Sequence, residues 1–62
     1  MDRAELVEQK EAIKAEIASV LRRIAQAQGS GAKPSRIAEL DAQLQALMAE
    51  EHRLRLLLDR AR

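Results

Sequence analysis

The sequence predicts an all-α protein, an antiparallel two-helix hairpin with helices at about residues 3–28 and 35–60. Three observations predict this fold. Two stretches of similar length repeat apolar residues at the three-and-four spacing of an amphipathic helix. A segment with two Gly and one Pro, residues 29–34, separates them. Charges alternate in blocks that face their opposites only if the chain reverses. Residues 1–62 therefore form one small helical-hairpin domain with its turn at 29–34.

The first helix has a clear start signal. Asp2 and Glu5 have the spacing of a capping box, and Met1 and Leu6 that of a hydrophobic staple. The apolar residues that follow form a heptad seam at positions a and d. These seam residues are Leu6, Ile13, Ile17, Val20, Ile24 and Ala27.

The turn follows from glycine and proline chemistry. Gly29 and Gly31 accept the positive φ that often ends a helix. Pro34 lacks an amide hydrogen and disfavours helical geometry at Lys33. We expect the first helix to stop near Gln28 and the stretch from Gly29 to Ser35 not to be helical.

The second helix is expected to begin with Ser35 as its N-cap, with Pro34 at the first helical position as the alternative. Arg60 and Arg62 complement the negative end of its dipole. Glu51 interrupts an otherwise apolar seam. That seam consists of Ile37, Leu40, Leu44, Leu47, Leu54, Leu58 and Ala61.

Loop length and charge both predict that the chain reverses. A connection of six or seven residues suits antiparallel neighbouring helices. Residues 17–36 carry four bases and no acid, whereas residues 37–51 carry four acids and no base. Opposed blocks select a topology more than they stabilise it, because exposed ion pairs contribute little. The resulting register places Ile24 against Leu40, Val20 against Leu44, Ile17 against Leu47 and Leu6 against Leu58.

Two polar seam positions fall in adjacent layers of this register. Glu51 lies opposite Ile13, and Lys10 lies opposite Leu54, so that Lys10 or Lys14 can reach Glu51. Such a pair is either solvated at the edge of a groove or a buried polar layer that fixes the register.

The apolar surplus predicts self-association. The chain has no Phe, Tyr or Trp to fill a small core, and a lone hairpin buries one face of each helix. We expect a homodimer, an antiparallel four-helix bundle of coiled-coil type. The leucine-rich end of the second helix is either the centre of that dimer or a docking patch for another protein. The candidate interface residues are Val7, Leu21, Met48, Leu54, Leu56, Leu57 and Leu58.

The composition indicates the cellular compartment of the protein and whether it spans a membrane. There is no Cys, which suits a reducing compartment, and we expect a cytoplasmic protein. No apolar run follows the first charged residues, so no signal peptide is expected. The longest uninterrupted apolar run is Leu56–Leu58, too short to span a membrane.

No motif points to catalysis. His52, the only histidine, falls at a solvent-facing position, and no His-Glu spacing repeats as a metal site in a helix bundle requires. The loop around Lys33 lacks the spacing of a phosphate-binding loop and follows no strand. We expect no enzymatic activity, no cofactor and no metal.

A basic cluster surrounds the turn and gives a second hypothesis. A net positive tip can meet phosphates or another polyanion. The lack of aromatic residues and of one long basic stripe disfavours nucleic acid. The primary prediction is a non-enzymatic adaptor, scaffold or small assembly component; the alternative is a nucleic-acid-binding bundle. Its candidate contacts are Arg22, Arg23, Lys33 and Arg36.

Overall fold

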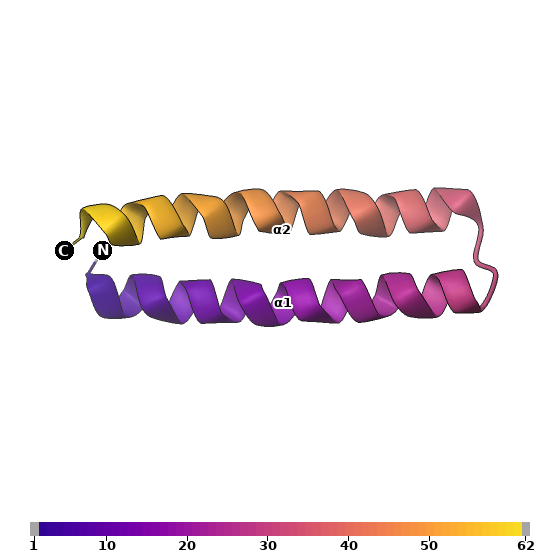
Figure 1. Ribbon diagram of the computed structural model, residues 1–62, viewed down its shortest axis with the longest axis horizontal. Coiled ribbons are helices and arrows are strands. Elements are labelled where there is room, and N and C mark those ends of the chain that lie inside the picture. The colour runs from indigo at the N-terminus through magenta and orange to yellow at the C-terminus, as the bar shows by residue number, and fades with distance from the viewer. Residues whose placement is uncertain (1, 62) are drawn as a thin grey trace.

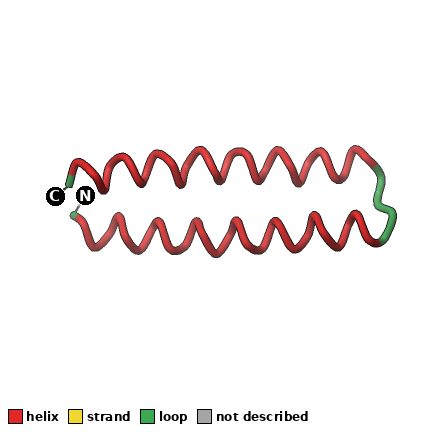
Figure 2. The backbone as a smooth tube through the Cα atoms, viewed as in Figure 1, coloured by secondary structure: helices red, strands yellow, loops and turns green. Residues whose placement is uncertain are grey.

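The computed structural model describes residues 2–61 as two antiparallel helices packed side by side and joined by a short turn (Figure 1). Helix α1 spans Arg3–Gly29 and helix α2 spans Pro34–Arg60. The molecule is a rod of 46 × 14 × 13 Å. Residues 2–61 contain no strand, and the connection is the only non-helical stretch between the helices (Figure 2). The predicted all-α hairpin is thus confirmed.

Helix α1 begins as its sequence predicts. Asp2 has extended backbone geometry, and its Oδ1 accepts a hydrogen bond from the Glu5 backbone N–H at 2.9 Å. This bond satisfies one of the first N–H groups, which have no partner inside the helix. The expected staple between Met1 and Leu6 lies outside the described residues.

The end of α1 is a Schellman motif. Gly31 has a φ of +72°, and the next residue, Ala32, donates its N–H to the Ala27 carbonyl at 2.9 Å. The Gly31 N–H points to the Gln28 carbonyl at 3.4 Å. The Ser30 hydroxyl adds a bond to Ala27 at 3.2 Å. Carbonyls left open at the helix end are satisfied within the turn.

The expectation for Gly29 was wrong. Gly29 is the last residue of α1 and does not take a positive φ; among the described glycines only Gly31 does. One left-handed residue is enough to end the helix, because both bonds of the motif form around it. The non-helical connection is therefore shorter than the predicted turn and runs from Ser30 to Lys33.

The expected N-cap of α2 was also wrong, and the alternative start holds. Lys33 is the N-cap and makes no side-chain capping bond, while Pro34 occupies the first turn. Proline is favoured there because its φ is already helical and its missing N–H is not needed. Ser35 therefore lies inside the helix. The Lys33 carbonyl accepts from the N–H groups of Arg36 and Ile37 at 3.0 and 3.2 Å.

The core is one thin layer between the helices. Only some of the large apolar residues in this layer are fully buried, because each helix is covered by a single neighbouring helix. Seam residues such as Ile13, Ile17, Ile24 and Leu47 remain half-buried. The buried core consists of Leu6, Val20, Leu40, Leu44 and Leu54.

Two shallow grooves report the register of the helices. In one, Glu16, Ser19, Val20 and Arg23 of α1 meet Gln43, Ala46 and Leu47 of α2. In the other, Arg3, Val7, Lys10 and Glu11 meet Arg55, Leu58 and Asp59. The first set brackets the layers of Val20 with Leu44 and Ile17 with Leu47, and the second brackets Leu6 with Leu58. Both agree with the register expected from the apolar layers.

Candidate interaction surfaces

Four large apolar side chains stay exposed on the hairpin. Val7, Leu21, Met48 and Leu56 retain between 40% and 50% of their accessible surface. In the heptad numbering of the seam, Val7 and Leu21 share position e of α1 and Met48 has position e of α2. Leu56 falls at position f, the side of α2 that points away from α1. Exposed apolar side chains of this size on a small chain are typical of association surfaces.

The leucine-rich end of α2 divides into different environments. Leu54 retains 1% of its accessible surface and belongs to the hairpin core, so it offers nothing to a partner. Leu57 and Leu58 are half-buried. Only Leu56 is exposed, so this end of α2 is a less continuous apolar patch than its sequence suggests.

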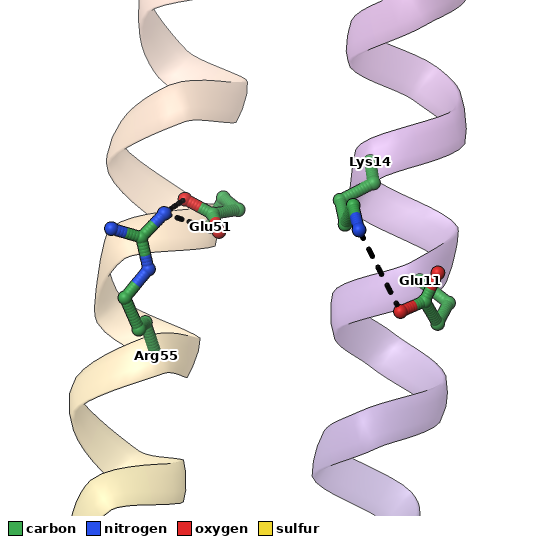
Figure 3. A network of polar contacts seen from close by, with 4 residues as sticks. All are labelled: Glu11, Lys14, Glu51 and Arg55. Carbon is green, nitrogen blue, oxygen red and sulfur yellow. Dashed lines mark hydrogen bonds and ion pairs between the residues drawn. The ribbon is translucent and has the colours of Figure 1, made fainter.

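Glu51, the polar residue of the α2 seam, finds its ion-pair partner within its own helix. The Glu51 side chain retains 14% of its surface, and Arg55 of the same helix donates to both of its carboxylate oxygens at 2.8 Å (Figure 3). Lys14, one of its expected partners, instead pairs with Glu11 at 3.9 Å. No ion pair joins the two helices within residues 2–61. Glu51 therefore forms neither a cross-helix ion pair nor a fully buried polar layer.

Electrostatics at this position still involve both helices. The hydrogen bonds from Arg55 lower the pKa of Glu51 below its usual 4.5, against an opposing effect of desolvation. The nearby charges of Arg55, Lys10 and His52 lower the pKa further. Lys10 thus lies close enough to act on Glu51 through space without bonding to it.

A neighbouring pair on α2 behaves in the same way. Arg53 donates to the carboxylate of Glu50, and this hydrogen bond lowers the pKa of Glu50 below 4.5. The same bond raises the pKa of Arg53. Both pairs join residues three or four apart, which is the spacing at which side chains meet on a helix surface.

The predicted basic cluster around the turn remains exposed to solvent, and most of its charges take part in no ion pair among the described residues. Arg22, Arg23, Lys33 and Arg36 are all exposed. Arg36 pairs with Glu39 of α2 at 3.4 Å. Within the part of the chain that the structure describes, the other three take part in no ion pair. Arg23 also lines the first groove, beside Gln43 of α2.

A second stripe on α1 escaped the sequence reasoning. It follows positions b and e, and every one of its side chains is exposed. The sequence predicted Val7 and Leu21 as interface residues but not the stripe that joins them, because the alanines beside them are common in any helix and give a weak signal. We call this surface the outer α1 stripe; it comprises Ala4, Val7, Glu11, Lys14, Ala18, Leu21 and Ala25.

The described residues gather no metal-binding cluster. Residues 2–61 contain no group of three or more His, Cys, Asp or Glu placed to hold a metal ion. His52 is exposed on α2. Neither described helix contains a segment long and apolar enough to cross a membrane.

Comparison with protein-family models, with curated proteins and with solved structures gives no match. No relative therefore informs the function.

Proposed function

We propose that this chain is a non-enzymatic interaction protein, a self-associating helical hairpin that acts as an adaptor, scaffold or small assembly component. One observation carries the proposal. The hairpin encloses five apolar residues and leaves four large ones between 40% and 50% exposed. Ordering a chain of this length has a high entropic cost, and small domains usually meet it with further burial. A second hairpin supplies that burial in an antiparallel four-helix bundle.

Sedimentation equilibrium over a range from about 1 to 100 μM tests self-association, since micromolar affinity corresponds to about 8 kcal/mol. We expect the mass to rise from that of the 6.9 kDa chain toward twice that value. The thermal midpoint should rise with concentration as well, because association stabilises the folded state by mass action. A folded monomer with a constant midpoint across the range would contradict the proposal.

The basic turn supports a second candidate function, contact with a polyanion such as nucleic acid. The observation in its favour is that Arg22, Arg23 and Lys33 stay exposed and take part in no ion pair among residues 2–61. Against it stands Glu39, whose carboxylate neutralises Arg36. Unpaired cations at one end of a rod suit phosphate groups, and phosphate binding releases counterions.

A salt series with duplex DNA and hairpin RNA tests this second function. Binding by the turn should weaken steeply with salt, with a logarithmic slope of roughly −0.9 per phosphate contact on duplex DNA. The variant R22Q/R23Q should flatten that slope, whereas R53Q/R60Q, which removes two arginines of α2 beyond the turn, should not. Absence of binding at low salt removes this candidate.

A further inference from the structure

The outer α1 stripe has an internal order that fits a second copy of itself. Its residues follow one another at spacings of three and four and lie on one side of α1. Small and large apolar side chains alternate on either side of a charged centre. That centre is the ion pair of Glu11 with Lys14, whose side chains keep 64% and 57% of their surface (Figure 3).

An antiparallel second α1 matches this order in each layer between Ala4 and Leu21. If Glu11 of one copy lies opposite Lys14 of the other, Val7 faces Ala18 and Ala4 faces Leu21. A two-fold axis between the copies repeats each contact, so that Ala4 and Ala18 each receive a larger side chain and each charge meets its opposite. Alternating large and small residues across an interface lets two helices interdigitate closely.

Other registers of the same two helices lose this match. Placing Val7 opposite Leu21 brings Lys14 against Lys14 of the second copy. Displacing one copy along α1 by four more residues places Glu11 against Leu21 and Lys14 against Ala18. Buried charges without partners and opposed like charges both disfavour these arrangements. The charged centre therefore determines one register.

Helix α2 has no equivalent surface. At the same heptad positions it presents mostly polar residues, and the only large apolar side chain among them is Met48. Leu56, the other large apolar side chain that is exposed on α2 among the described residues, lies at position f, away from α1. A symmetric contact between hairpins is thus better supplied by α1 than by α2.

We propose that a second copy of this chain docks on the outer α1 stripe, α1 against α1 and antiparallel, with Glu11 of each copy paired to Lys14 of the other. This inference rests on the proposed self-association and names its face and register. The paired part of the stripe, from Ala4 to Leu21, covers about 25 Å of α1 at 1.5 Å per residue, which indicates a small interface and micromolar association.

Charge exchange at the centre tests the register. The variant E11K opposes two cations at each symmetric contact, and K14E opposes two anions. We expect each variant alone to self-associate about tenfold more weakly than the native chain, as two altered charge contacts imply. An equimolar mixture of the two should recover native affinity as a heterodimer, detected by native mass spectrometry with one variant isotopically labelled.

The mixture separates the interface from the stability of α1 itself. Both single variants lose the ion pair within their own helix, and mixing cannot restore it. Recovery therefore reports a contact between copies. The matched control is a mixture of E8K with K33E, which carries the same net charges at exposed positions outside the stripe. This mixture should show no comparable recovery.

Two exposed leucines provide a second test. Leu21 and Leu56 are exposed to a similar degree, but only Leu21 belongs to the stripe. Leu21→Ser should weaken dimerisation, whereas Leu56→Ser should leave it unchanged.

The outcomes distinguish this inference from the proposed function. If the native chain dimerises but E11K, K14E and Leu21→Ser all dimerise equally well, self-association stands and the α1 interface is overturned. The interface is likewise overturned if only Leu56→Ser weakens the dimer. A native chain that is monomeric throughout removes both.

Discussion

Gly29 and Gly31 are separated by a single serine, yet only Gly31 has a backbone that requires glycine. Its φ of +72° lies in the left-handed region, where a Cβ atom is strained. Gly29 is helical, and a Cβ added there would meet no atom within 4 Å. Sequence alone does not separate the two, since both lie between helical stretches and either can end a helix.

Substituting alanine at each glycine should change stability in opposite directions. Gly29→Ala should raise the free energy of unfolding by about 0.5–1 kcal/mol, because alanine restricts the unfolded chain and favours the helix. Gly31→Ala should lower it by about 1–2 kcal/mol through the left-handed backbone. Urea unfolding followed by circular dichroism measures both. Equal effects of the two changes would contradict the Schellman assignment.

At the scale of the helices, the two N-termini differ in how they are capped. Asp2 caps α1 with its side chain, whereas Lys33 leaves α2 without a side-chain capping bond. The predicted Ser35 cap was wrong because Pro34 fits the first helical position, so that the N-cap is Lys33, two residues earlier. Start signals thus predict that a helix begins nearby more reliably than they predict its first residue.

The missing cap of α2 can be supplied. Lys33→Ser places a hydroxyl where it can accept from an N–H of the first turn, and it should stabilise the hairpin by about 0.5–1 kcal/mol. Asp2→Ala should destabilise it by a similar amount through loss of the bond to Glu5. Thermal denaturation of both variants checks the pair. A destabilising effect of Lys33→Ser would show that the lysine has another structural role.

The acidic residues of α2 predict a dependence on pH. Hydrogen bonds from Arg53 and Arg55 lower the pKa of Glu50 and Glu51 in the folded state below 4.5. A carboxylate with a depressed folded pKa stabilises the fold at pH values above its unfolded pKa, and this contribution is lost as the pH falls through the folded pKa. Stability should therefore decline as the pH is lowered from about 4.5.

Denaturant titrations between pH 7 and pH 2 measure this decline. The variant E50Q/E51Q should show a flatter profile over the same acidic range, since its amides do not titrate. The matched control E5Q/E8Q removes two exposed carboxylates of α1 that form no ion pair within residues 2–61. An unchanged profile in E50Q/E51Q would contradict the role assigned to these two pairs.

At the scale of the whole molecule, the hairpin was predictable from the sequence, and its self-association stays a prediction. Apolar periodicity and turn chemistry are local signals, and together with the charge blocks they predicted two helices, their reversal and their register. The partner of Glu51 was missed, because Arg55 on the same helix reaches it without crossing the seam. The outer α1 stripe was missed because Ala4 and Ala18 are ordinary residues in a helix until they are placed on the same side of α1 as Val7 and Leu21.

The thin core makes the whole fold depend on each enclosed leucine. Leu54→Ala should cost about 2–5 kcal/mol, comparable to the total stability of about 3–5 kcal/mol typical of so small a core. We therefore expect loss of most helical signal at micromolar concentration. Leu56→Ala, on the exposed side of the same helix, should keep the helical signal. Far-ultraviolet circular dichroism compares them, and equal losses would contradict the assigned burial.

The ends of the two helices that lie away from the turn are neighbours at one end of the rod (Figure 1). A force that draws Asp2 and Ala61 apart would therefore act perpendicular to the helices and on the end of the seam, so that only the outermost layer bears it at any moment. The layers would separate one at a time, beginning with those near Leu6, and never share the load as they would in shear. Such a hairpin yields at low tension, and its last intact part would be the turn held by Gly31.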